Sequence, residues 1–106
     1  MRLGVRAALV DGALVEGDVT VQDGAVAAVG VAPAGSRGTA VPGFVDAHIN
    51  GTAGVDFFAA DEQGYRDAAQ ALAGRGVVAF QPTFVSAPAG AYAEPLGLVT
   101  RQTRRG

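Results

Sequence analysis

Cysteine and tryptophan are absent from this 106-residue sequence, and histidine occurs once. Without cysteine the chain has no disulfide framework, no thiolate zinc cluster and no cysteine nucleophile. Long apolar runs are missing as well, and Arg2, Arg6 and Asp11 interrupt any signal-peptide core near the N-terminus. The formal net charge is −2, whereas proteins that bind nucleic acid independently of sequence normally carry a net positive charge. We therefore expect a cytoplasmic protein that binds neither nucleic acid nor a membrane.

Hydrophobic residues make up 49% of the chain, which predicts a packed core rather than a disordered tail. Within the first thirty residues, Asp11-Gly12 and Asp23-Gly24 each stand between two apolar runs. An Asp-Gly pair in that position is a strong hairpin signal, because both residues tolerate the positive φ of a type I′ turn. A third turn at residues 16–18 joins the two hairpins. The segment is therefore predicted to be a meander of about four short antiparallel strands.

Residues 30–43 are rich in glycine and proline, which predicts an irregular linker. We place a domain boundary near its end. The expected organisation is a small antiparallel β-domain over residues 1–41 and a second domain over residues 42–106.

The second domain is predicted to begin with a strand over residues 44–50 and a long loop over residues 51–60. A helix capped by Asp61 is predicted over residues 61–75, followed by an apolar strand over residues 77–80 that is buried on both faces. This order is typical of a βαβ unit with two parallel strands, so the expected fold class is α/β. Toward the C-terminus, prolines and glycines oppose a further helix, and residues 100–106 are predicted to be a solvated terminus.

Period-two alternation divides the first strand of the second domain into two faces. The apolar face, which we expect the helix to cover, consists of Val45, Ala47 and Ile49. The polar face consists of Asp46, His48 and Asn50. In parallel α/β folds the active sites lie at the carboxyl ends of strands, which is where His48 and Asn50 stand. Thr83, just past the second strand, could face the same pocket, or its hydroxyl could satisfy local backbone groups.

His48 is the single candidate metal ligand among these residues. Imidazole binds zinc or iron, whereas a carboxamide oxygen such as that of Asn50 is a better hydrogen-bonding group. A lone histidine is more often structural than catalytic, and the sequence holds no second histidine or cysteine that would complete a metal site. Dinucleotide-binding, P-loop and nucleophile-elbow patterns are also absent. The residues by themselves leave open whether His48 is a metal ligand or a structural residue.

Two segments resemble the opening of the amidohydrolase superfamily. They are Val-Gln-Asp-Gly-Ala-Val-Ala-Ala-Val-Gly at residues 21–30 and Val-Pro-Gly-Phe-Val-Asp-Ala-His at residues 41–48. The continuation His-Ile-Asn-Gly-Thr-Ala-Gly-Val-Asp-Phe at residues 48–57, with Gly-Val-Val-Ala-Phe-Gln-Pro-Thr-Phe-Val-Ser-Ala at residues 76–87, is similar to the N-acetylglucosamine-6-phosphate deacetylase family. The resemblance runs from residue 5 to residue 87.

The resemblance implies that the chain is the start of a TIM-like (β/α)8 barrel, preceded by part of a small β-domain. It implies metal-dependent hydrolysis of N-acetylglucosamine 6-phosphate to acetate and glucosamine 6-phosphate. It also implies a divalent metal such as zinc, an amino-sugar phosphate as the small-molecule partner, and a homo-oligomer for the full-length family. On this basis His48 would be a metal ligand, and Asp46, Asn50 and Thr83 would line the active site.

Asn50 stands where the superfamily usually has the second histidine of an HxH pair. The family's glutamate and two histidine ligands, and its catalytic aspartate, would lie beyond Gly106, because a (β/α)8 barrel takes about 250 residues. We therefore expect an N-terminal fragment that holds no catalytic residue and is inactive by itself. Two alternatives remain. One is another amidohydrolase, dihydroorotase- or deaminase-like, that acts on a cyclic amide; the other is a non-enzymatic truncated gene product.

Overall fold

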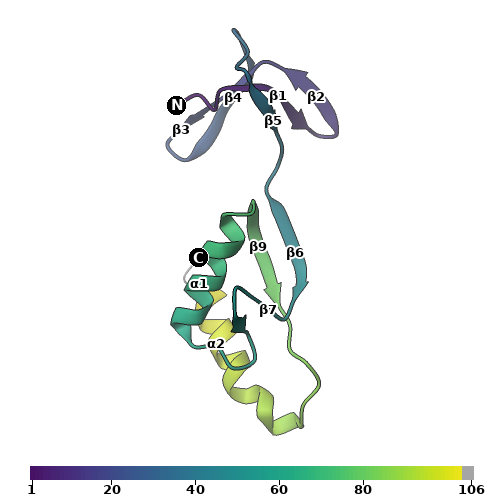
Figure 1. Ribbon diagram of the computed structural model, residues 1–106, viewed down its shortest axis with the longest axis vertical. Coiled ribbons are helices and arrows are strands. Elements are labelled where there is room, and N and C mark those ends of the chain that lie inside the picture. The colour runs from purple at the N-terminus through teal and green to yellow at the C-terminus, as the bar shows by residue number, and fades with distance from the viewer. Residues whose placement is uncertain (104–106) are drawn as a thin grey trace. The chain divides into compact units, whose positions relative to one another are not determined.

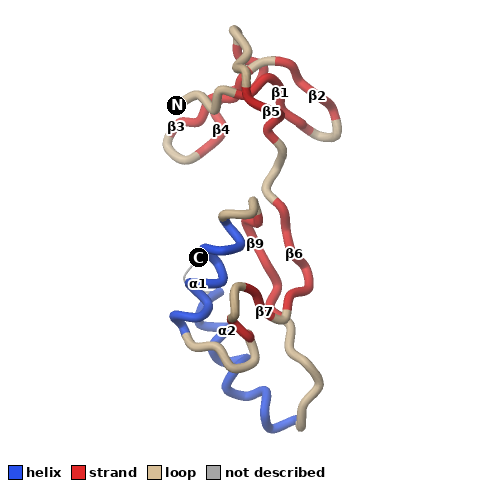
Figure 2. Tube along the Cα trace, in the orientation of Figure 1, coloured by secondary structure: helices blue, strands red, loops and turns tan. Residues whose placement is uncertain are grey.

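The computed structural model describes residues 1–103. It is a mixed α/β structure with mostly strands and two α-helices (Figure 1 and Figure 2). The chain divides into two compact units, Met1–Pro42 and Gly43–Gly106. Neither α-helix of the described chain is long and apolar enough to cross a membrane.

The strands of the first unit are β1 (Val5–Val10), β2 (Ala13–Glu16), β3 (Asp18–Gln22), β4 (Ala25–Val31) and β5 (Arg37–Ala40). Both predicted hairpins are confirmed, because β1 pairs antiparallel with β2, and β3 pairs antiparallel with β4. Asp11 and Gly12 have φ angles of 49° and 79°. Asp23 and Gly24 have φ angles of 51° and 76°. These are the left-handed conformations that a type I′ turn requires.

The predicted meander is wrong in its overall topology, because a further strand forms inside the predicted linker. Strand β5 pairs in parallel with β1, with Val5 opposite Arg37. The resulting sheet has the order β2-β1-β5, and β3-β4 is a separate ribbon, so the unit is not purely antiparallel. Gly35 permits this crossing, because a Cβ at that position would collide with the backbone of Gly4. The Gly35 amide instead donates to the Val5 carbonyl at 2.8 Å.

Asp18 connects three parts of the first unit and is only 2% exposed. Its Oδ1 accepts hydrogen bonds from the amides of Val5 at 3.0 Å and Val19 at 2.8 Å. Its Oδ2 accepts from Arg2 Nε at 2.9 Å. Burial raises the pKa of the Asp18 carboxyl, but the two amides and the Arg2 guanidinium together outweigh it and lower the pKa below its ordinary value. Asp18 therefore stays ionised and ties β1 to β3.

The second unit contains β6 (Phe44–Ile49), the short hairpin strands β7 (Gly51–Thr52) and β8 (Val55–Asp56), helix α1 (Glu62–Ala73), strand β9 (Val77–Pro82), a 3₁₀ turn (Ala89–Tyr92) and helix α2 (Ala93–Thr103). Strands β6 and β9 pair in parallel, which confirms the predicted strand–helix–strand order (Figure 1). Asp61 caps α1 as expected, since its Oδ1 accepts the Gly64 amide at 2.8 Å.

Phe57 is the centre of the core of the second unit and is 0% exposed. Its ring stacks on Tyr65 from α1, with ring centroids 4.9 Å apart, and on Phe80 from β9, with centroids 5.4 Å apart. Leu98 from α2 belongs to the same buried cluster. The segment 51–60, predicted only as a long loop, thus supplies the largest fully buried side chain.

Much of the β6–β9 pair is exposed, contrary to the sequence predictions. Val78 is 73% exposed, so β9 is not buried on both faces. Val45 is 68% exposed, and from the predicted apolar face of β6 only Ile49 packs against the core cluster. The pairing register shifts between Asp46 and Ile49. This irregularity disturbs the period-two alternation on which the prediction rested.

Helix α2 forms in a segment where the sequence argued against a helix. Pro95 lies in its first turn, where a backbone N–H would have no intrahelical partner in any case. Gly97 is tolerated because the adjacent Leu98 is buried in the core, and tertiary packing outweighs the low helix propensity of glycine. Residues 100–103, predicted to be a solvated terminus, belong to this helix. The rest of that predicted terminus, residues 104–106, lies outside the described residues.

Candidate functional site at the ends of two parallel strands

The carboxyl ends of β6 and β9 lie next to each other because the two strands are parallel. Asn50 directly follows β6, and Thr83 directly follows β9. Thr83 Oγ1 donates a hydrogen bond to Asn50 Oδ1 at 2.5 Å, and the Thr83 amide donates to the Ile49 carbonyl at 2.9 Å. Two of the residues selected from the sequence, 33 positions apart, are therefore in direct contact.

Thr83 fixes the orientation of the Asn50 carboxamide. Because the hydroxyl donates to Oδ1, the Nδ2 group is directed away from this bond, and no residue within 1–103 accepts from it. Asn50 is exposed and Thr83 is half-buried, so a ligand can reach the carboxamide. The Thr83 hydroxyl thus donates to the side chain of Asn50 and not to a local backbone group.

Asp46 and His48, the other two residues selected from the sequence, stay outside this contact. Asp46 Oδ1 accepts a hydrogen bond from the backbone amide of His48 at 3.2 Å, which is a local bond within β6. The His48 side chain is exposed, and its ring has no hydrogen-bond partner in the described part of the chain. The strand ends therefore gather Asn50 and Thr83 and leave Asp46 and His48 further back along β6.

The β7–β8 hairpin holds the chain as it leaves β6. The Phe57 amide donates to the Asn50 carbonyl at 2.9 Å, so the backbone of Asn50 is anchored to the segment that carries the central core residue. A Cβ on Gly51 would collide with the Val55 carbonyl oxygen, so the hairpin needs glycine directly after Asn50. The position of Asn50 thus follows from the core and the hairpin together.

The metal that the family resemblance implies needs more ligands than these residues provide. Zinc sites take three or four protein ligands, mostly from His, Cys, Asp and Glu. Within residues 1–103 no three such side chains come together. Asn50 Oδ1 already accepts from Thr83, and carboxamide oxygen suits transition metals poorly. The described residues therefore do not fit a complete metal site, and the chemistry they offer by themselves is hydrogen bonding.

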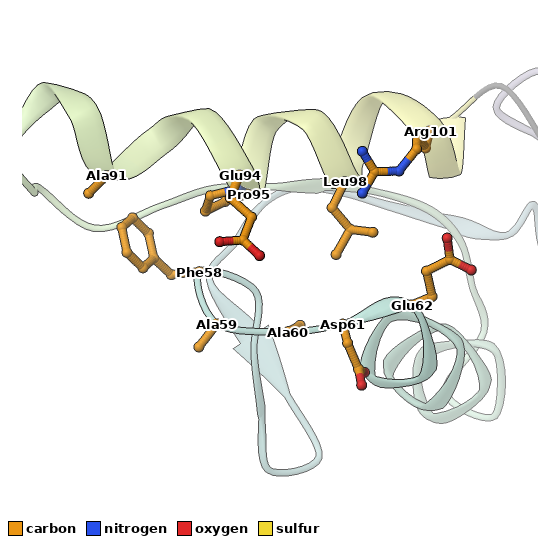
Figure 3. A pocket seen from close by; sticks show the side chains of 10 residues that line it. All are labelled: Phe58, Ala59, Ala60, Asp61, Glu62, Ala91, Glu94, Pro95, Leu98 and Arg101. Carbon is orange, nitrogen blue, oxygen red and sulfur yellow. The ribbon is translucent and has the colours of Figure 1, made fainter.

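A cavity of about 430 Å³, which no sequence pattern predicted, lies between α2 and residues 58–62. Its lining combines apolar groups with carboxylates, including Phe58, Ala60, Pro95, Leu98, Glu62 and Glu94. In Figure 3 the Glu94 carboxylate reaches from α2 toward the loop, whereas the Asp61 carboxylate is directed to the first turn of α1 that it caps. Without an expected helix at residues 93–103, no local pattern could place Glu94 opposite this loop.

Comparison with protein-family models, with curated proteins and with solved structures found no match.

Proposed function

We propose that this chain belongs to a cytoplasmic, metal-dependent amidohydrolase that converts N-acetylglucosamine 6-phosphate to glucosamine 6-phosphate and acetate. The chain would supply the start of a TIM-like barrel and part of the β-domain that precedes it. One observation carries the proposal: β6 and β9 are parallel, and their carboxyl ends bring Asn50 and Thr83 together. Barrel enzymes build their active sites at this end of the strands.

The proposed role of Asn50 is to bind the substrate. Its Nδ2 group would donate to an oxygen of the amino sugar, and Thr83 would position it by holding Oδ1. His48 is proposed as one ligand of a zinc or similar divalent ion whose remaining ligands come from other residues. When bound, such a metal would polarise the amide carbonyl and activate a water molecule.

The test uses the whole natural open reading frame that contains these residues, expressed and purified with zinc. Acetate release from N-acetylglucosamine 6-phosphate is the readout. We expect kcat/KM to fall by about tenfold in Asn50→Ala and by about fivefold in Thr83→Val, because each change removes a hydrogen bond at the site. Ser86→Ala, at an exposed position, is the matched control and should leave kcat/KM unchanged. The 106-residue chain by itself should release no acetate.

Other outcomes would contradict the proposal. Hydrolysis of a cyclic amide such as dihydroorotate, without deacetylation of the amino sugar, would assign the protein to a different amidohydrolase activity. A folded, zinc-loaded protein that acts on neither substrate class would favour a non-enzymatic product. Unchanged kcat/KM in both Asn50→Ala and Thr83→Val would show that the carboxyl ends of these strands are not part of the active site.

A further inference from the structure

Tyr92 ends the 3₁₀ turn that follows the loop after β9, and its side chain reaches back to that loop. The hydroxyl accepts a hydrogen bond from the Ala87 amide at 2.7 Å and donates one to the Val85 carbonyl at 3.0 Å. Within residues 1–103, these are the two hydrogen bonds that the backbone of residues 84–87 makes. One side chain therefore determines the path of the chain between Thr83 and the 3₁₀ turn.

Pro88 explains why this loop takes a side chain as its partner. Proline has no amide hydrogen, and Pro88 has φ and ψ angles of −55° and 143°, which are extended. The loop therefore closes no regular turn on itself before residue 88. A hydroxyl group both donates and accepts, so Tyr92 satisfies one carbonyl and one amide at the same time. Phenylalanine at this position would leave both backbone groups without their partner.

The ring of Tyr92 contacts the loop that follows β6. It packs edge-to-face on Phe58, with ring centroids 5.7 Å apart. Phe58 packs in the same way on Phe84, with centroids 5.8 Å apart. Figure 3 shows the Phe58 ring directed toward the segment that carries Ala91, the neighbour of Tyr92. Edge-to-face packing is a preferred arrangement of aromatic rings, so the three rings join the loops that follow β6 and β9.

Two of these rings belong to residues that directly follow the partners of Asn50. Phe58 follows Phe57, whose amide donates to the Asn50 carbonyl at 2.9 Å. Phe84 follows Thr83, whose hydroxyl donates to Asn50 Oδ1. The contacts thus form a closed circuit, in which Asn50 is held from both loops and the aromatic rings hold the loops together.

We infer that Tyr92 is a positioning residue for the Asn50 carboxamide. It makes no hydrogen bond to Asn50 itself and acts by fixing the backbone that continues from Thr83. A group that binds substrate needs neighbours that lock its conformation, because small displacements weaken a directional hydrogen bond. The inference rests on the proposed function, in which Asn50 Nδ2 donates to an oxygen of the amino sugar. It adds that the loop after β9 determines how tightly that sugar is bound.

The test uses Tyr92→Phe, which keeps the ring that contacts Phe58 and removes only the hydroxyl. Tyr65→Phe is the matched control, because it removes the other tyrosine hydroxyl of the chain, which has no hydrogen-bond partner within residues 1–103. The first readout is the pair of side-chain amide NMR signals of Asn50 in the 106-residue chain. Tyr92→Phe should move these signals part of the way toward their positions in Thr83→Val, since the bond between Thr83 and Asn50 is then formed less of the time. Tyr65→Phe should leave them in place.

The second readout is the kinetics of the whole natural open reading frame, purified with zinc and assayed with N-acetylglucosamine 6-phosphate. Tyr92→Phe should raise KM by about threefold and leave kcat unchanged, because it weakens a contact made equally in the ground state and the transition state. In a Thr83→Val background it should raise KM no further, since the bond that Tyr92 positions is then absent. A general loss of stability would not show this dependence on Thr83.

Asn50 signals that stay in place in Tyr92→Phe, or that move equally in the two tyrosine variants, would overturn the inference. An equal rise of KM in the native and Thr83→Val backgrounds would overturn it as well. A protein that does not deacetylate the amino sugar would contradict the proposed function instead. The Asn50 signals would then decide by themselves whether Tyr92 positions this side chain.

Discussion

Thr83 Oγ1 donates to Asn50 Oδ1 at 2.5 Å, although 33 positions separate the two residues in the sequence. The contact joins the first residue after β6 to the first residue after β9. It therefore couples the geometry of the candidate site to the pairing of the two strands, and a change at either residue affects both.

Thr83→Val should destabilise the second unit by about 1 kcal/mol, because valine keeps the side-chain shape but cannot donate to Asn50. Both tyrosines, Tyr65 and Tyr92, lie in this unit, so tyrosine fluorescence during urea unfolding reports on it. In a double-mutant cycle with Asn50→Ala, the second substitution should cost less once the first is present. If the two changes in the free energy of unfolding were strictly additive, the hydrogen bond between Thr83 and Asn50 would contribute nothing to stability.

Phe57→Ala should destabilise the second unit by about 3–5 kcal/mol, since it removes the ring that Tyr65 and Phe80 stack on. The neighbouring Phe58→Ala is the matched control. Phe58 is half-buried and makes only edge-to-face ring contacts, at 5.8 Å with Phe84 and 5.7 Å with Tyr92. Urea midpoints that fall equally in the two variants would contradict the central position of Phe57.

The first unit should lose stability in acid because of Asp18. Folding lowers the pKa of its carboxyl, so the unfolded chain binds the proton more readily than the folded one. The stabilisation is therefore fully present above the ordinary aspartate pKa of about 3.9 and is lost as the pH falls through the lower folded value. This loss of stabilisation can be measured by hydrogen exchange of the Val5 and Val19 amides between pH 6 and pH 2.5, with the exchange rates corrected for the intrinsic effect of pH. In Asp18→Asn the exchange protection should be lower throughout and should depend less on pH.

Tyr65→Phe should leave the stability of the second unit unchanged or raise it slightly, because the hydroxyl that it removes is buried without a partner within residues 1–103. Burial also raises the pKa of this hydroxyl, so the native protein should resist its ionisation in alkaline solution. Urea unfolding at neutral pH compares the variant with native protein, and Tyr65→Ala provides the contrast. That variant should lose about 3–5 kcal/mol, as for other buried aromatic rings. A clear loss of stability in Tyr65→Phe would mean that the hydroxyl is hydrogen-bonded after all.

Local patterns predicted the parts of this fold that local chemistry determines. The two Asp-Gly turns set their own hairpins, because the positive φ angles belong to the turn residues themselves. The Asp61 cap likewise depends on Gly64, three positions along the chain. Asn50 was selected on the polar face at the carboxyl end of one predicted strand and Thr83 just past the end of another, and the parallel pairing of those strands brings the two residues together.

The features that the sequence did not predict depend on distant partners. Strand β5 forms because β1, more than thirty residues earlier in the chain, offers it an edge. Helix α2 forms because the buried cluster around Phe57 accepts Leu98, which outweighs the low helix propensity of Gly97. The exposed Val45 and Val78 show the reverse case, in which strongly apolar residues have no element of the described chain to cover them.

The parallel pairing of β1 with β5 has a consequence for the rate at which the first unit folds. Hairpins such as β1–β2 and β3–β4 close within about 1–10 μs, since their partners are adjacent in sequence. Placing Val5 opposite Arg37 requires a much larger loop to close before the contact gains any free energy. During synthesis, moreover, β1 must wait until residue 40 has left the ribosome before its second edge can be filled. We therefore expect β5 to be the last strand of this unit to order, and its addition to set the overall folding rate.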